Sequence, residues 1–345
     1  VFKQIKVVFA MQLKKQEITL SDGTRAEAQT PVIISASRST DIPTFYSDWF
    51  IKRWEAGYLK WTNPFNGKPL YISFSNTRLV VFWTKNPRPM FKYLDYLDKN
   101  IPNYYFQFSL NDYDKEGYEG KVSSVEKRIK TFKELSQRVG KKRVVWRFDP
   151  LILTNEIDIK ELLRRVKRIG DELKEFTEKL VFSFVDIAIY KKVQSNLQKE
   201  QVPYIEWTPE LMDEFAKGIS EINKDWGLEL GTCSEKIDLD KYGIEHNKCI
   251  DDDLMIDLFS HDKELMDFLG VKIEQADLFS DGEVIKTKKL KDKGQREDCG
   301  CIIAKDIGAY NTCPHECNYC YANTSKEIAK KNYHNSLNNP NSESI

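Results

Sequence analysis

The chain has 345 residues, enough for one large α/β barrel or for two ordinary domains. Lysine plus arginine and aspartate plus glutamate number 53 each, so the formal net charge is zero and a global electrostatic attraction to nucleic acid or to an anionic membrane is not expected. Apolar runs are all shorter than the roughly eighteen residues of a membrane span, and the apolar start lacks a small-residue cleavage site. These features predict a cytoplasmic protein that does not enter a membrane.

Strand-length apolar runs alternate with helical patterns along the chain. The runs are too apolar to alternate cleanly, as is typical of strands buried on both faces. A repeated strand-then-helix order predicts parallel strands with crossover helices. The predicted strands cover residues 32–41, 78–87, 103–112, 143–150, 180–186 and 228–235, and the helical patterns cover 44–57, 88–100, 123–140, 155–179 and 208–227.

This order predicts an α/β protein with a full or partial (β/α) TIM-type barrel, and an open doubly wound sheet is the alternative. We expect a single barrel domain over residues 1–345, because the sequence contains no internal repeat and no long linker. Two predicted hairpins decorate it: one in residues 1–30, around Asp22-Gly23, and one in residues 58–75. The lysine-rich segment 284–298 is predicted to be a loop, and 299–333 is a C-terminal iron–sulfur cluster segment.

Polar side chains follow the predicted strands at the point where each strand ends. In a (β/α) barrel the carboxyl ends of the strands carry the chemistry. A buried charge such as Arg147 needs a partner or a ligand, although any single member of the set is equally well explained as a loop polar group or a helix cap. Cations here suit a carboxylate or phosphate, and the aspartates suit hydroxyl or amine groups. The set is Arg38, Asp41, Lys85, Asn86, Asn111, Asp112, Arg147, Asp149, Ser183, Asp186, Cys233 and Glu235.

Three cysteines near the C-terminus have the spacing of a metal-binding loop. The total of seven cysteines is odd and no export signal is present, which disfavours a disulfide framework. Cys313, Cys317 and Cys320 form a C-x3-C-x2-C pattern, in which Cys313 lies too close to the other two to begin a separate zinc knuckle. Three such thiolates suit three irons of a 4Fe–4S cluster and leave the fourth iron open. The spacing therefore favours iron–sulfur over zinc, which stays open as the alternative.

The segment "CPHECNYCYAN" resembles the cluster loop of radical S-adenosylmethionine (SAM) enzymes, and its ending is similar to that of the spore photoproduct lyase branch. The resemblance implies that the three cysteines bind a 4Fe–4S cluster whose open iron binds SAM. Reductive cleavage of SAM would then release a 5′-deoxyadenosyl radical that abstracts hydrogen from a substrate, and Tyr319 would lie near the adenine. In that superfamily the loop usually follows the first barrel strand. Its position here, after residues 301–310, implies a circularly permuted barrel.

The whole chain resembles the bacterial domain-of-unknown-function family 1848, through "SASRSTDIP", "NPFN", "FWTKNP", "WRFDP" and "DIGAYNTCPHECNYCYAN". The radical SAM resemblance implies a reductant such as a flavodoxin or ferredoxin, and a small-molecule substrate fits the neutral charge better than nucleic acid. A nucleotide-like substrate is the alternative, with the lysines between 286 and 293 as its anchor. The residues expected to hold SAM or substrate are Arg38, Asp41, Lys85, Asn86, Arg147, Asp149, Ser183, Asp186 and Tyr319. The sequence contains no obvious counterpart of the superfamily's Gly-Gly-Glu motif.

The remaining cysteines, Cys233, Cys249, Cys299 and Cys301, form one full ligand set for a second centre, either an auxiliary 4Fe–4S cluster or zinc. Alternatively, Cys233 and Cys249 are small buried hydrophobic residues. In a third interpretation, Cys299 or Cys301 is a catalytic hydrogen donor or a thiol that faces the substrate.

The chain has four histidines, of which two lie near cysteines. His315 is expected to shield or hydrogen-bond a sulfide, and His246 to support or complete the set around Cys249. His261 and His334 are predicted to be surface residues.

The competing hypothesis is a non-catalytic protein: an iron–sulfur redox carrier or sensor, or a zinc-binding module. A carrier would complete its cluster with a fourth protein ligand, for instance Cys301. It would not need a row of charged residues at the strand ends. That row favours an enzyme.

Overall fold

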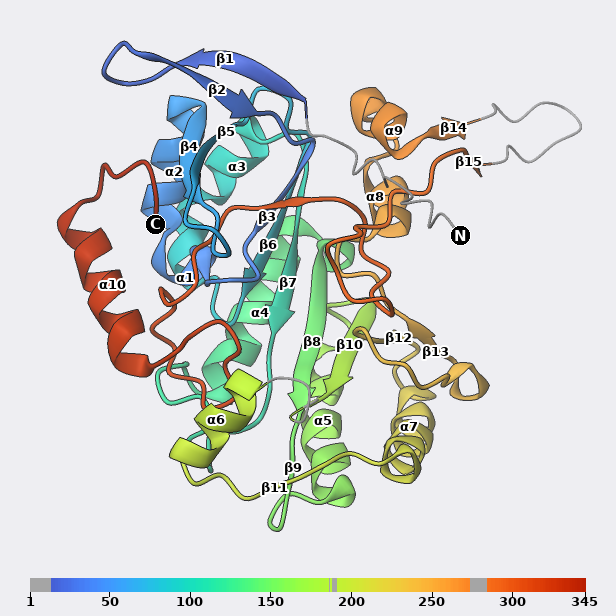
Figure 1. Ribbon diagram of the computed structural model, residues 1–345. Helices are drawn as coiled ribbons and strands as arrows, with labels where there is room; N and C mark the ends of the chain where they lie inside the picture. Colours follow the sequence, from blue (N-terminus) through green and yellow to red (C-terminus); the bar gives the residue numbers. More distant parts are fainter. Residues whose placement is uncertain (1–13, 186, 188–190, 274–283) are drawn as a thin grey trace, which may run out of the picture.

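The computed structural model describes residues 14–185, 187, 191–273 and 284–345 (Figure 1). Its centre is an eight-stranded parallel sheet in the order β13-β12-β10-β8-β7-β6-β3-β16. The strands are β3 (Ile33–Ala36), β6 (Leu79–Thr84), β7 (Tyr104–Ser109), β8 (Val144–Leu151), β10 (Lys179–Phe184), β12 (Glu229–Thr232), β13 (Ile244–His246) and β16 (Lys305–Asp306).

Seven strands, from β3 to β13, lie in the sheet in chain order, which is the arrangement of a barrel rather than of a doubly wound sheet with a reversal point. The edge strands β13 and β16 are not paired with each other in the part of the chain that the structure describes, so the sheet forms a partial barrel. The six predicted strands are present. Two short strands, β13 and β16, join them at the edges.

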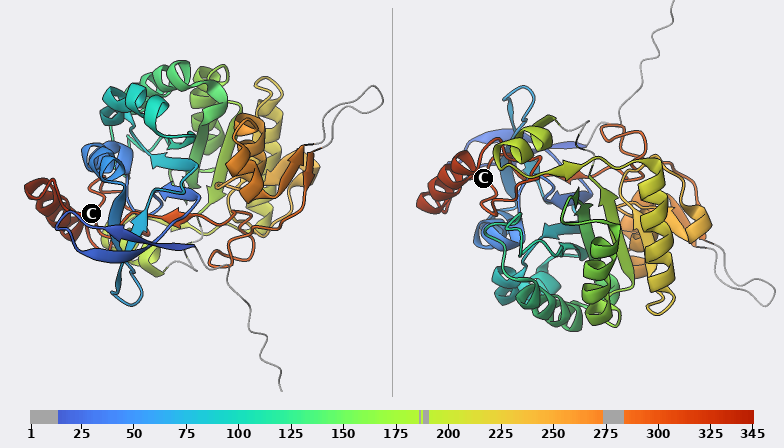
Figure 2. Two further views of the ribbon diagram at one scale, coloured as in Figure 1. Left: turned by 90° about the horizontal axis from the view of Figure 1, so that it is seen from above. Right: turned by 90° about the horizontal axis from the view of Figure 1, so that it is seen from below.

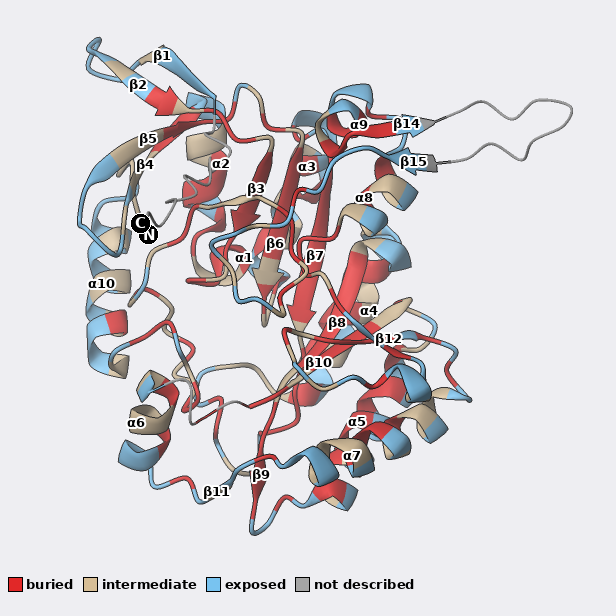
Figure 3. Ribbon diagram, turned by 45° about the vertical axis from the view of Figure 1, so that its right-hand side comes forward, coloured by how far each residue is buried: buried red, intermediate tan, exposed pale blue. Residues whose placement is uncertain are grey.

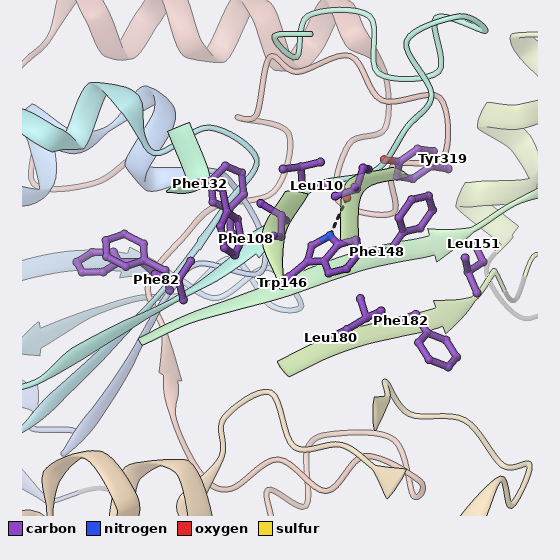
Figure 4. Close-up of a cluster of buried hydrophobic side chains, with 14 of the residues drawn as sticks. Phe82, Phe108, Leu110, Phe132, Trp146, Phe148, Leu151, Leu180, Phe182 and Tyr319 are labelled. Carbon is purple, nitrogen blue, oxygen red and sulfur yellow. Dashed lines mark hydrogen bonds between the residues drawn. The ribbon is translucent and has the colours of Figure 1, made fainter. Parts of the chain in front are cut away.

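The face of the sheet that carries the even-numbered side chains of β6 to β8 packs against helices. Phe82, Trp146 and Phe182 lie in this buried cluster with Phe132 of α4 (Figure 4). The indole Nε1–H of Trp146 donates to the carbonyl of Leu110 at 3.0 Å, so its polar atom is satisfied inside the core. The helices and 3₁₀ turns of this layer are α1 (Ile42–Phe45), α2 (Ser47–Ala56), η1 (Arg88–Tyr93), α3 (Leu94–Asn100), α4 (Val125–Val139), η2 (Lys141–Arg143), α5 (Ile159–Leu173), α6 (Lys191–Lys199), α7 (Pro209–Asn223) and η3 (Asp240–Tyr242).

The opposite, inner face carries the odd-numbered side chains, because neighbouring residues of a strand point to opposite faces. Val81 and Tyr105 pack there in a second buried cluster with Met255 and Phe259 of α8 (Asp252–Phe259). Helix α9 (Lys263–Leu269) belongs to the same cluster and begins with an aspartate cap, Asp262, that accepts from the Leu265 N–H. Figure 3 shows that the central strands are almost wholly buried.

Short strands outside the main sheet form three smaller sheets. Strands β1 (Lys15–Thr19) and β2 (Arg25–Gln29) are antiparallel, as are β4 (Tyr58–Thr62) and β5 (Pro69–Ser73), and together they form a sheet in the order β1-β2-β5-β4. The other pairs are β9 (Leu153–Thr154) with β11 (Tyr204–Ile205), and β14 (Val271–Ile273) with β15 (Val284–Lys286). The segment 284–298, expected to be a loop throughout, therefore begins with a strand, because β14 provides it with a partner.

The C-terminal segment returns to the start of the sheet. β16 pairs with β3, with Lys305 opposite Ile34, although the two strands are about 270 residues apart in the chain. Helix α10 (Lys326–Asn338) then packs beside α1 and α2 (Figure 2). The centre of the Tyr333 ring lies 5.3 Å from that of Phe45 and 5.7 Å from that of Tyr46. The cysteine loop, residues 311–325, lies between β16 and α10. Among the described residues, no helix is long and apolar enough to cross a bilayer.

Candidate functional site

The cysteine loop lies against the loop that follows β7. Glu119 forms a β-bridge with Cys317, and the Asn318 N–H donates to the carbonyl of Tyr118 at 2.9 Å. Within the loop, the Asn323 amide donates to the carbonyl of Cys313 at 2.7 Å. These contacts, two through the backbone and one through the Asn323 side chain, fix the loop although it contains no regular secondary structure.

The three thiols of this loop have the surroundings of metal ligands. Cys313, Cys317 and Cys320 are free and partly buried. Burial raises the pKa of Cys317 to about 12, and burial also raises the pKa values of Cys313 and Cys320. Backbone N–H groups donate to two of the sulfurs, from His315 to Cys313 and from Ala322 and Asn323 to Cys320. Three partly buried thiols, two of them next to backbone N–H donors, fit a metal centre, because metal ligation deprotonates a thiol that burial would otherwise keep neutral.

His315 attaches the loop to the start of α1. Its Nε2 lies 2.8 Å from Oδ2 of Asp41, and its ring meets Phe45 edge-on at 4.6 Å. The Asp41 carboxylate also caps α1 through the Thr44 N–H at 2.9 Å and accepts from the Lys85 N–H at 2.7 Å. Both carboxylate oxygens are therefore engaged, and Asp41 acts as a positioning residue for the loop. Nδ1 of His315 is buried without a hydrogen-bond partner among the described residues.

A buried carboxylate, Glu119, pairs with two cations beside the cysteine loop. Its oxygens lie 2.7 Å from Nζ of Lys85 and 3.0 Å from the guanidinium of Arg128. Burial alone would raise the pKa of Glu119, but these two cations outweigh it and lower the pKa to about 2. Tyr319 donates its hydroxyl to the same carboxylate, and the Asn111 amide donates to it at 3.1 Å.

This network accounts for two of the predicted site residues. Nζ of Lys85 lies 3.1 Å from the hydroxyl of Tyr319 and 5.4 Å from the centre of its ring. Tyr319 is 7% exposed, so its ring is held in place by packing as well as by the network. Sequence reasoning missed Glu119, because it lies in a loop and becomes a site residue only through its bridge to Cys317.

A second group of polar side chains lies on the inner face of the sheet. The Arg147 guanidinium pairs with the Asp149 carboxylate, which also accepts from the Ser183 hydroxyl. Burial would raise the pKa of Asp149, but Arg147 and the Ser183 hydrogen bond lower it. The structure thus brings together three residues predicted from strand ends. Asp186, the fourth of that prediction, lies outside the described residues.

Two further strand-end residues, Arg38 and Asn86, make contacts of different kinds. The Arg38 N–H donates to Asp306 at 2.7 Å, and Asp306 also accepts from the hydroxyls of Ser35 and Ser37, which joins β16 to β3. By contrast, Asn86 accepts from the Arg88 N–H at 3.3 Å at the start of η1.

Two more strand-end residues make structural contacts. Asp112 pairs with Arg168 of α5 at 2.9 Å, and Glu235 accepts from the Phe184 N–H at 2.9 Å. Asn86 and Asp112 therefore stabilise helices next to the site.

The other four cysteines also converge. Sγ of Cys233 lies 3.5 Å from Sγ of Cys249, and Cys301 contacts both Cys249 and Cys299. His246, expected to support or complete this set, is exposed on β13. His261 and His334 are exposed, as predicted.

Comparison with known proteins identifies the family but no activity. No curated protein matches the chain. A Bacteroides thetaiotaomicron VPI-5482 crystal structure described as a "putative alpha-L-fucosidase" aligns with 12% identity over 48% of this chain and 67% of that chain, at a TM-score of 0.24. A likeness this low bears on neither fold nor function. The family model of DUF1848, a domain of unknown function, matches residues 33–322, and the chain belongs to that family.

Proposed function

We propose that the chain is an iron–sulfur enzyme of the radical SAM type, acting on a small polar or nucleotide-like substrate. One observation carries this proposal: the C-x3-C-x2-C loop directly follows β16, which pairs with β3 at the edge of the parallel sheet, and all three of its thiols are free. The position of β16 beside β3 supports the circular permutation. A loop after β16 has the same relation to the sheet as a loop after a first barrel strand.

Cys313, Cys317 and Cys320 would hold the 4Fe–4S cluster. When bound, a cluster with one open iron supplies the one-electron reductive cleavage of SAM to methionine and a carbon radical. The chain contributes the charge around it. Lys85 lies within electrostatic range of Cys317 and Cys320, and Arg128 of Cys317, so both cations offset thiolate charge in a buried site where such interactions are strong.

The Glu119 network would position Tyr319 against the cofactor. The ring cannot swing away without breaking the hydroxyl bond to Glu119 and the bonds to Asn111 and Lys85. A fixed aromatic ring at the edge of the cluster loop can stack on a nucleobase and exclude water from it.

Arg147, Asp149 and Ser183 would bind the substrate on the inner face. The guanidinium of Arg147 is 2% exposed and offers a fixed positive charge, and Asp149 and Ser183 offer an acceptor and a hydroxyl. A ligand with both an anionic group and hydroxyl or amino groups matches this set. That combination describes a small polar metabolite or a nucleotide.

The test uses anaerobically purified protein reconstituted with iron and sulfide. We would record the electron paramagnetic resonance spectrum of the reduced protein with and without SAM, and measure 5′-deoxyadenosine and methionine formed with dithionite. Cys317→Ala removes one ligand, and His334→Ala is the matched control because His334 is exposed on α10. Wild type and H334A should show a SAM-dependent spectrum and both products, and C317A should show neither. Bound iron with no response to SAM would reject the proposal in favour of a redox carrier or sensor, and zinc without iron would reject it in favour of a zinc-binding module.

A further inference from the structure

Four cysteines outside the C-terminal loop meet inside the partial barrel. Cys233 follows β12, Cys249 follows β13, and Cys299 and Cys301 precede β16. Sγ of Cys233 and Sγ of Cys249 are 3.5 Å apart, and the thiols of Cys249, Cys301 and Cys299 are close enough in that order to shift one another's pKa values. All four are free thiols, and three of them are buried. We propose that these four cysteines bind a second metal centre, a 4Fe–4S cluster, within the barrel.

The backbone that carries these cysteines is held by the sheet. The carbonyl of Cys249 accepts from the hydroxyl of Tyr105 at 2.8 Å and from the side-chain amide of Gln107 at 2.9 Å, both on the inner face of β7. Cys301 is tied to the same segment, because its sulfur accepts from the Ile250 N–H at 3.4 Å and the Ile302 N–H donates to the carbonyl of Ile250 at 3.1 Å. The ligand positions are therefore built by contacts between segments far apart in the chain.

The charge around the sulfurs matches an anionic centre. The guanidinium of Arg147 lies 2.9 Å from Sγ of Cys249, and Arg38 lies within electrostatic range of Cys249 and Cys301. Buried guanidinium groups need anions, and four thiolates around a metal or a cluster leave a net negative charge. Asp149 and Asp306 each pair with one of these guanidinium groups, and an anionic centre would be a further partner for both.

Polar atoms around the four sulfurs also lack protein partners. The hydroxyl of Ser234, next to Cys233, is buried without a hydrogen-bond partner among the described residues, and so is the indole Nε1 of Trp83. Ser234 is 8% exposed, and Trp83 packs beneath the Arg147 guanidinium at 5.3 Å. Both groups are donors, and the sulfides of a cluster are acceptors that would satisfy them.

The spacing of the sulfurs is uneven: Cys233 and Cys249 lie 3.5 Å apart, as two ligands of one zinc ion would, but the whole set is wider. In a tetrahedral zinc site with Zn–S bonds of about 2.3 Å, all four sulfurs lie about 3.8 Å from one another. Here the four sulfurs do not all lie within 4.8 Å of one another. A cubane of four irons spreads its thiolate ligands more widely than one ion does. None of the four belongs to the C-terminal loop, so this inference needs no cluster in that loop, although it shares Arg147 with the proposed substrate site.

The test compares four forms of the full chain after anaerobic reconstitution with iron and sulfide: wild type, C313A/C317A/C320A, C249A/C301A and the combination of both sets. Iron and acid-labile sulfide per chain are measured, with the electron paramagnetic resonance spectrum of the reduced protein. We expect about eight irons in wild type, about four in each variant and almost none in the combination. Among the three variants, only C249A/C301A should keep the SAM-sensitive signal of wild type, so failure of this inference and failure of the proposed function give different results.

Loss of iron from C249A/C301A could also follow from damaged packing, so Met255→Ala is the matched control. Met255 is fully buried in the same hydrophobic cluster as Cys249 and Cys301 but offers no metal ligand here. M255A should keep about eight irons.

A second measurement does not depend on removing cysteines. In the C313A/C317A/C320A background, Arg147→Gln should shift the midpoint potential of the remaining cluster to a more negative value, because the reduced cluster loses a neighbouring positive charge. Three results would overturn the inference: no iron in C313A/C317A/C320A, zinc in place of iron, or a Cys233–Cys249 disulfide in the anaerobic wild type.

Discussion

Replacing Glu119 with glutamine should destabilise the protein strongly, because Glu119 is the shared anion of two buried cations. Its side chain is 1% exposed, as against 0% for Arg128 and 16% for Lys85. The lowering of its pKa from 4.5 to about 2 corresponds to about 3 kcal/mol of stability, and removing one partner of a buried ion pair typically costs about 3–5 kcal/mol. We expect E119Q to lose about 3 kcal/mol of unfolding free energy at pH 7.

The pH dependence of this loss has a defined direction. Since the folded pKa of Glu119 lies below the unfolded value of 4.5, its contribution is complete above pH 4.5 and disappears as the pH falls towards 2. The difference between wild type and E119Q should therefore be constant from pH 5 to 8 and shrink below pH 4.5.

Urea titrations under anaerobic conditions, followed by tryptophan fluorescence, measure this difference. The matched control is Glu27→Gln, which removes a carboxylate from an exposed pair with Lys15 and should change stability by less than about 1 kcal/mol. Replacing Arg128 with methionine in the E119Q background should recover part of the loss, because it removes a buried charge that has lost one of its two carboxylate partners, the other being Asp114 at 3.2 Å. If E119Q were no less stable than E27Q at pH 7, the ion cluster would not hold this site together.

Three further predictions concern the attachment of the C-terminal segment. Asp41→Ala and Asp158→Ala each remove a helix N-cap worth about 1 kcal/mol. Only D41A also removes the contact with His315, so a chelator should remove iron faster from D41A than from wild type or D158A. Gly308→Ala should destabilise the fold by about 1–3 kcal/mol in urea titrations, since the added Cβ would lie 2.0 Å from the Ser37 hydroxyl. Gly120→Ala is the control, because the nearest atom to its added Cβ lies 3.7 Å away, and its stability should be close to that of wild type. Burial lowers the pKa of Lys305 to about 8, and its Nζ lies over the Trp61 ring. Tryptophan fluorescence should therefore titrate with a midpoint near pH 8 in wild type and should not do so in Lys305→Met. The contribution of Lys305 to the unfolding free energy should rise as the pH increases from about 8 to 10.5.

Local patterns were sufficient to predict the regular elements of the barrel. β3, β6, β7 and β12 fall within predicted apolar runs, and β8 and β10 overrun theirs by one residue, because a strand buried on both faces leaves a continuous hydrophobic signal. β13 and β16 were too short to produce that signal, and they are strands only because β12 and β3 supply hydrogen-bond partners. Helices α6, α8 and α9 were missed for a related reason: they are short, and most of the support for α8 and α9 comes from packing against the inner face.

For the site, the sequence by itself determined the chemistry of the ligands, and the tertiary structure decided which of them meet. Cysteine spacing identified Cys313, Cys317 and Cys320 as one loop, because three ligands within eight residues need no distant partner. The roles of Glu119, Asp41 and Asp306 depend on contacts with residues up to about 270 positions away, which no local pattern records. The same holds for the second set of cysteines, Cys233, Cys249, Cys299 and Cys301. The sequence shows that four cysteines remain outside the C-terminal loop, but only the curvature of the sheet and the return of the chain to β3 bring their sulfurs together.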